Sequence, residues 1–162
     1  MQVPEMSYGL LGGLAIALTV AGVTDLRRRQ IDNWLNAAIA LTAPLFWWAQ
    51  GLALSTIGWQ LATALAAFVV LAGLFAIRAM GGGDVKLLTA LALWIKPEWF
   101  LHLLMIMAIA GGILTLAMGV WHVTRRRKER LAVPYGIAIA VAGIWGLVSD
   151  YLPALQAGGK LG

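Results

Sequence analysis

Cysteine is absent from this chain of 162 residues, and charged residues make up only 12% of it. The lack of cysteine excludes disulfides, thiolate metal ligands and cysteine nucleophiles. With 61% hydrophobic residues and a mean hydropathy of +0.84, the chain carries more apolar surface than a soluble domain of its size can bury. The composition therefore predicts an integral membrane protein, folded as an all-α helical bundle in a single domain over residues 1–162.

Basic residues are scarce outside three short segments, residues 27–29, 78–86 and 125–130. These hold three, two and five of the twelve lysines and arginines. Because the three segments flank apolar stretches, membrane topology accounts for the net charge of +5 better than nucleic-acid binding does. No lysine or arginine precedes Arg27, so the first apolar segment lacks the basic start of a signal peptide, and we expect it to remain in the mature protein.

Six apolar segments predict six membrane-spanning helices, at about residues 7–23, 34–48, 56–77, 85–95, 99–123 and 132–152. The fourth segment is short: at about 1.5 Å per residue, it spans only about half of a ~30 Å hydrocarbon core. Because basic loops stay on the cytoplasmic side, the first, third and fifth connections are expected in the cytoplasm. Both termini are then expected outside.

A glycine run ending in a carboxylate, Gly81, Gly82, Gly83 and Asp84, separates the third and fourth apolar segments. Glycine has no Cβ atom, so this run can bend, adopt positive φ and admit a neighbouring chain. We expect Asp84 to cap a helix that begins at Val85. A carboxylate is costly in an apolar setting, which also makes Asp84 a candidate for function.

A second carboxylate, Asp25, ends the first apolar segment on the same predicted side of the membrane. If the first and fourth helices pack together, Asp25 and Asp84 share one site. Two close carboxylates do not both ionise readily, so one keeps a proton while the other acts as a base. Such a pair activates water for attack on a peptide carbonyl. Helix capping, and a proton or cation site, are the alternative roles.

Several neighbouring residues have two possible roles. Asp32 or Asn33 is expected to cap the second helix. Lys86 either fixes the topology or favours the ionised form of Asp84. The segment 134–136 opens the sixth helix, with Pro134 in its first turn. Tyr135 either hydrogen-bonds a catalytic carboxylate or lies at the membrane interface.

Histidine is represented only by His102 and His122, both in the fifth apolar segment. Twenty residues along a helix correspond to ~30 Å, so the two side chains do not bind one metal ion together. No metal and no organic cofactor is expected.

Three motifs, in order along the chain, resemble those of the type IV prepilin peptidases. Residues 81–84 fit the Gly-x-Gly-Asp motif of intramembrane aspartic proteases. Residues 25–27, followed by 31–35, resemble the motif around that family's first aspartate. Residues 134–138, which include Gly136, are similar to the start of the family's last helix. The resemblance covers essentially the whole chain.

This resemblance implies a membrane aspartic endopeptidase in which Asp25 and Asp84 form the catalytic dyad. Its substrate would be a prepilin with a basic leader and one hydrophobic helix, cut after a glycine at the cytoplasmic face of the bacterial inner membrane. Where the family usually has proline, this chain has Asp32, which is expected to cap a helix or to recognise basic leader residues.

The chain resembles the short branch that processes Flp-type pilins of tight-adherence systems. Larger members carry an N-terminal region with paired cysteines and also methylate their product, so methyltransferase activity is not expected here. Membrane lipid is the other expected partner, and the oligomeric state is open. The alternatives are an archaellin-type leader peptidase and a non-enzymatic membrane subunit or small transporter.

Overall fold

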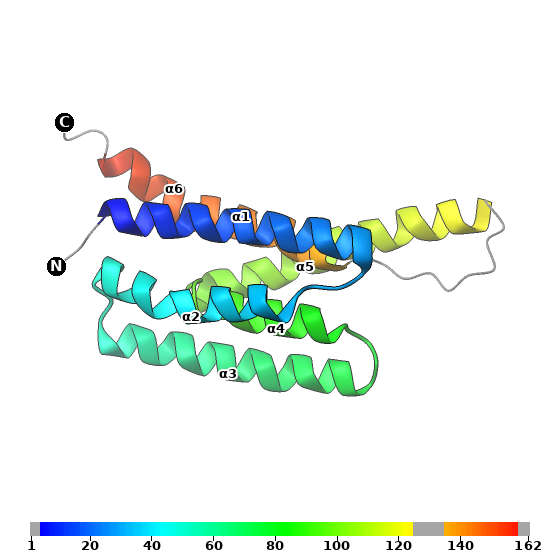
Figure 1. Cartoon of the computed structure of the whole chain (residues 1–162), viewed down its shortest axis with the longest axis horizontal. Coiled ribbons are helices and arrows are strands. Elements are labelled where there is room, and N and C mark those ends of the chain that lie inside the picture. Colours follow the sequence, from blue (N-terminus) through cyan, green and yellow to red (C-terminus); the bar gives the residue numbers. More distant parts are fainter. Residues whose placement is uncertain (1–3, 125–134, 159–162) are drawn as a thin grey trace.

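The computed structural model describes residues 4–124 and 135–158, and all regular structure within these ranges is helical. The elements are α1 (Pro4–Arg28), α2 (Asn33–Gln50), α3 (Leu54–Ala76), α4 (Gly82–Ala92), α5 (Pro97–Thr124) and α6 (Tyr135–Gly158). Their order and number confirm the predicted all-α bundle with a short fourth helix. Figure 1 shows that α1 begins and α6 ends at the same end of the bundle.

The short helix α4 is the core of the bundle. Seven of its eleven residues are buried, whereas α3 buries only three of its 23. The helix packs on α3 and α2, while α1 packs on α6 and α2, and α5 packs on α6. The enclosure of α4 follows from its place among these neighbours and not from its apolar character alone, because the apolar helix α3 is mostly exposed.

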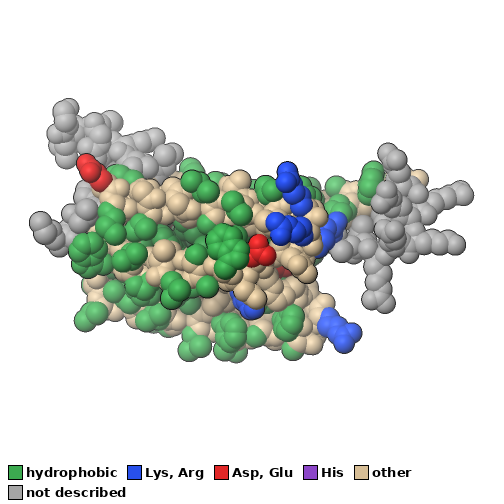
Figure 2. Space-filling model, in the orientation of Figure 1, with side chains coloured by type: hydrophobic (Ala, Val, Ile, Leu, Met, Phe, Trp, Pro, Cys, Tyr) green, Lys and Arg blue, Asp and Glu red, His purple; other side chains and the backbone are tan. Residues whose placement is uncertain are grey.

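The outside of the bundle is apolar, as a membrane protein requires. Three helices are long and apolar enough to cross a membrane by length and composition: α1 from Glu5, α3, and α5 as far as Trp121. Within their most apolar windows only 17–28% of the residues are buried. Figure 2 shows hydrophobic side chains over the flank of the bundle. Apolar surface on this scale faces lipid more favourably than water, so the structure is a membrane helical bundle.

Basic side chains gather at one end of the molecule, on the right in Figure 2. This is the end at which α1 and α3 terminate and α4 begins. The first two of the three basic connections, residues 27–29 and 78–86, thus share one end, while the third, residues 125–130, lies outside the described residues. That this end faces the cytoplasm stays a prediction.

The start of α4 differs from the expectation. The helix begins at Gly82, three residues before Val85, and its N-cap residue is Gly81, with φ −74° and ψ 145°. Asp84 therefore lies within the first helical turn and is not the N-cap residue. The expectation was wrong because the glycines were assigned to a loop, although the helical conformation is open to glycine at only a modest entropic cost.

Glycine is also not the residue that takes positive φ near this turn. Among the described residues, Gly51 is the one glycine with positive φ, whereas Arg29 and Arg78 adopt φ of 55° and 60°. Arg78 follows α3, where the amide of Ala79 donates to the carbonyl of Leu74 at 2.8 Å. This pattern is typical of a left-handed helix C-terminus.

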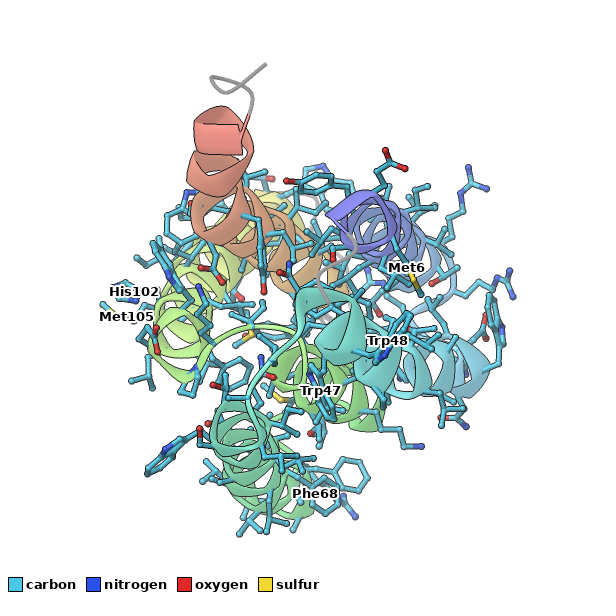
Figure 3. The ribbon with its side chains drawn as sticks, turned by 90° about the vertical axis from the view of Figure 1, so that its left-hand side faces the viewer. Met6, Trp47, Trp48, Phe68, His102 and Met105 are labelled. Carbon is cyan, nitrogen blue, oxygen red and sulfur yellow. The ribbon has the colours of Figure 1, made fainter. Side chains whose placement is uncertain are left out.

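The other end of α4 is held by aromatic side chains and one ion pair. The indole of Trp94 donates to the carbonyl of Ile39 at 2.8 Å, and that of Trp47 donates to Leu93 at 2.8 Å. Figure 3 looks onto this end, with Trp47 labelled on α2. Lys96 Nζ lies 2.9 Å from Asp150 Oδ1, and the Asp150 side chain is only 3% exposed.

Candidate active site

Asp25 and Asp84 are brought to the same place in the structure. Asp25 lies in the last turn of α1 and is 7% exposed, and Asp84 lies in the first turn of α4 and is 8% exposed. Both line an open pocket of about 690 Å³ and a second pocket of about 460 Å³. The two aspartates share this site without the packing of the first and fourth helices that the sequence analysis named as a condition: α1 packs on α6 and α2, and only the ends of α1 and α4 meet at these pockets.

Helix α6 holds the Asp25 carboxylate by its backbone. The N–H of Gly136 donates to Asp25 Oδ2 at 2.8 Å, and this contact is buried. Gly136 lies in the first turn of α6, where backbone N–H groups have no partner within the helix and carry partial positive charge. A Cβ atom at position 136 would lie 2.7 Å from Asp25 Cβ, so this contact requires glycine.

The three glycines before Asp84 serve close approach rather than positive φ. A Cβ atom at Gly83 would lie 3.2 Å from Ile31 Cβ, and one at Gly82 would lie 3.3 Å from the ring of Phe75. One at Gly81 would lie 2.9 Å from Asp84 Oδ2. The glycines thus let the start of α4 sit against the α1–α2 connection, the end of α3 and its own carboxylate.

Asn36 is a site residue that the sequence interpretation missed. It lies on α2, is 5% exposed, and its Nδ2 donates to the carbonyl of Gly83 at 3.4 Å. Its Oδ1 is buried with no hydrogen-bond partner among the described residues. A buried polar atom left without a partner is unusual and calls for an explanation. The available sequence signal was an amide inside an otherwise apolar segment.

Asp32 occupies the N-cap position of α2, as predicted, but its side chain makes no capping hydrogen bond. Its backbone carbonyl accepts from Leu35 and Asn36 at 3.2 and 3.3 Å, while the half-buried side chain lines the smaller pocket. Asn33 accepts a hydrogen bond from Lys86 Nζ at 2.8 Å. Lys86 therefore reaches α2, and it lines neither of the pockets that hold Asp84.

Tyr135 lines the larger pocket, and its hydroxyl lies 3.4 Å from Thr115 Oγ1. Among the described residues its hydrogen bond is to Thr115 rather than to a carboxylate. The ring lies against α5, where a Cβ atom at Gly111 would approach Tyr135 Cε1 to 2.8 Å.

Of the remaining candidates, Pro134 and the side chain of His122 lie outside the part of the chain that the structure describes. His102 is remote from the site. It is exposed on α5 at the other end of the bundle, and its Nδ1 lies 2.8 Å from the carbonyl of Glu98 (Figure 3).

Two arginines lie in the pockets near Asp25 and Asp84 but, among the described residues, form no ion pair with them. Arg29 and Arg78 line the larger pocket, and Arg29 also lines the smaller one. Within residues 4–124 and 135–158, however, neither Asp25 nor Asp84 forms an ion pair. Two nearly buried carboxylates that line the same open pockets lie in one site and can reach water. This arrangement is suited to acid–base chemistry.

Two curated proteins match the chain, and both are named prepilin leader peptidase/N-methyltransferase. The protein of Xanthomonas campestris pv. campestris is 34% identical over 79 residues, which cover 45% of this chain and 26% of that protein. The protein of Pectobacterium carotovorum subsp. carotovorum is 29% identical over 73 residues, covering 45% of this chain and 25% of that protein. The matched part thus represents about a quarter of each relative. No solved structure matches this fold.

A family model also matches residues 13–116, a range that contains both aspartates and the glycine run but ends before α6. That model describes type IV leader peptidases, and the match extends over more than half of the sequence. Together with the two curated relatives, it confirms the resemblance drawn from the three motifs. The chain therefore belongs to the type IV leader peptidase family.

Proposed function

We propose that this protein is a membrane aspartic endopeptidase that removes the leader peptide of a type IV prepilin. The observation that carries the proposal is the pair of nearly buried carboxylates, Asp25 and Asp84, which line the same two pockets with no ion pair of their own. The family, and the names of its two relatives, support prepilin as the class of substrate.

The proposed mechanism divides two roles between the carboxyl groups. The ionised carboxylate takes a proton from a water molecule while the oxygen of that water bonds to the peptide carbonyl carbon. The other carboxyl donates its proton to the carbonyl oxygen, giving a tetrahedral intermediate. Collapse of this intermediate breaks the C–N bond: the new amine takes the proton held by the first carboxylate, and a hydroxyl of the intermediate returns a proton to the second as the carbonyl re-forms. The N–H of Gly136 donates to Asp25 Oδ2 and holds the Asp25 carboxyl group in position through both steps.

The charge pattern and the motifs support a proposal for the side of the membrane on which cleavage occurs and for the type of pilin that is cut. The site lies at the basic end of the bundle, which the positive-inside rule places in the cytoplasm, with both termini outside. The protein would then cut its substrate at the cytoplasmic face of the bacterial inner membrane. The resemblance to the short branch of the family, together with the absence of cysteine, favours Flp-type pilins of tight-adherence systems as substrates.

Cleavage of a candidate prepilin in membranes tests the proposal. Asp25→Asn and Asp84→Asn should each reduce the rate at least about 10³-fold at matched protein level. The double variant should be hardly slower than either single one, because the two groups act as a unit. The parent enzyme should show a bell-shaped dependence of rate on pH, since one carboxyl must be ionised and the other protonated.

Glu98→Gln is the matched control, because Glu98 is an exposed acid in the first turn of α5, at the other end of the bundle. This variant should cleave at the parent rate. Substantial activity in either single aspartate variant would refute the assignment of an aspartic mechanism.

A further inference from the structure

The two pockets that share Asp25 and Asp84 differ in chemistry. We propose that the substrate crosses the dyad in one direction. Its polar leader lies in the smaller pocket, and its membrane-embedded segment leaves through the larger one. This inference rests on the proposed function and deepens it, because it assigns a binding subsite to each side of the scissile bond.

The smaller pocket, which we call the leader pocket, is polar. Besides the two aspartates, Arg29 and the glycine run, it is lined by Gln30, Ile31, Asp32 and Asn33 from the α1–α2 connection and the start of α2. Ile31 is the one apolar side chain larger than glycine in this lining. Since the Asp32 carboxylate makes no capping hydrogen bond, it is available to a polar or cationic group of a peptide.

The larger pocket, which we call the exit pocket, has an apolar wall. Its lining residues beyond the shared ones are Phe75, Ala76, Ala79, Met80 and Tyr135, together with Arg78. The wall is built by the end of α3, the connection to α4 and the start of α6. Among the described residues, α3 and α6 do not pack on each other along their lengths, so the two parts of this wall come from helices that are not direct neighbours.

A polypeptide that is cut where a bundle meets the membrane boundary has two unlike sides. One side is in water and needs hydrogen-bonding partners, whereas the other is in hydrocarbon and gains from apolar contact. The leader pocket supplies carboxylate, amide and guanidinium groups, and the exit pocket supplies aromatic, thioether and methyl groups. The reverse orientation would bury polar peptide groups against the apolar wall and leave apolar side chains among charges.

Disulfide cross-linking tests the orientation cleanly because the chain has no cysteine of its own. Gln30→Cys reports on the leader pocket and Ala79→Cys on the exit pocket, since both side chains are exposed and line their pockets. Each is placed in an Asp84→Asn background, which keeps the substrate uncut. The prepilin substrate carries a single cysteine three residues before or three residues after the scissile bond.

Each enzyme cysteine is expected to cross-link one of the two substrate cysteines in roughly ten-fold higher yield than the other, because proximity raises effective concentration. Gln30→Cys should capture the leader cysteine, and Ala79→Cys the cysteine on the membrane side. Glu98→Cys, at the other end of the bundle, should capture neither. The reversed preference, equal capture by both positions, or no capture by either would each overturn the proposed orientation.

Cleavage of the same substrate by the unsubstituted parent protein separates this inference from the proposed function. Absence of cleavage would overturn the peptidase proposal and, with it, the orientation. Intact cleavage combined with cross-links that show no preference would overturn the orientation alone.

Discussion

Nearly buried carboxylates lie at both ends of α4, but their surroundings differ. At the end that follows the α3–α4 connection, Asp25 and Asp84 are 7% and 8% exposed and form no ion pair among the described residues. At the end that leads to α5, the Asp150 side chain is 3% exposed and lies 2.9 Å from Lys96 Nζ. Aromatic side chains then enclose this second end, where the rings of Phe46 and Trp94 stack 4.9 Å apart.

The difference separates a carboxylate with an ion pair from two carboxylates that form none among the described residues. A buried charge is tolerated when an opposite charge or hydrogen bonds compensate for lost hydration, and Lys96 supplies this for Asp150. At the other end only a backbone N–H, that of Gly136, supports Asp25. An ion pair therefore holds the end that leads to α5, whereas the carboxyl groups at the other end form no ion pair among the described residues and line open pockets.

Among variants outside the two aspartates, Gly136→Ala is expected to have the largest effect, because it disturbs the contact that holds the Asp25 carboxylate. The added methyl would lie 2.7 Å from Asp25 Cβ, so the carboxylate or α6 must shift. Since misplacing a catalytic group by about 1 Å costs about 10²-fold in rate, we expect a loss of that order or more. Cleavage of prepilin in membranes measures it.

Gly58→Ala serves as the control for this prediction, since nothing lies within 4 Å of a Cβ atom at that position on α3. It should leave the cleavage rate unchanged. A fully active Gly136→Ala variant would contradict the role given to the Gly136 contact.

Lys96→Met breaks the ion pair at the end that leads to α5 and should affect stability rather than chemistry. It leaves Asp150 buried without its partner, and because Lys96 itself is 45% exposed, we expect a cost of about 2–3 kcal/mol. Thermal unfolding in detergent measures this change. The folded fraction should cleave at the parent rate.

The double variant with Asp150→Leu should regain most of the stability, since no buried charge is left unpaired. If the double variant were no more stable than Lys96→Met, the buried charge would not be the cause.

Asn36→Leu should have a smaller effect, and this effect should fall on activity rather than on stability. It removes the amide that holds the Gly83 carbonyl, so we expect a roughly ten-fold loss of kcat. It also removes the unpartnered Oδ1, so thermal stability should stay the same or rise by up to about 1 kcal/mol.

A buried amide remote from the site provides the matched control for Asn36. Gln60 on α3 is 1% exposed and also has a buried oxygen without a partner among the described residues. Gln60→Met should preserve kcat. Parallel losses of activity in both variants would show that Asn36 acts through general packing rather than through the turn before Asp84.

Much of the candidate site could be predicted because charge is rare in this chain. Asp25 and Asp84 stand out in apolar surroundings, and alternating basic loops bring their segments to one end of the bundle. The hydrogen bond from Gly136 to Asp25 could not be predicted, since it joins a backbone amide to a side chain 111 residues away. The position of Asp84 within α4 was missed for a local reason, the helical conformation of the glycines before it.

Helix packing was the part of the fold that the sequence predicted least well. Carboxylates near one another do not require their helices to pack, and here α6 lies against α1 while α4 is held by α2 and α3. In a chain with apolar residues on every face of its helices, periodicity does not identify which neighbours meet. The roles of Asp32 and Lys86 were ambiguous for a related reason, because their contacts depend on that arrangement.

The dependence of Asp25 on α6 has a consequence for biogenesis. Ribosomes make the chain from its N-terminus, so α1 and the glycine run are in place before Gly136 has been synthesised. Until α6 inserts beside α1, the Asp25 carboxylate lacks the N–H that holds it, and the pockets lack the wall that Tyr135 contributes. If the protein is the proposed peptidase, a partly made chain is therefore expected to be inactive until α6 has inserted.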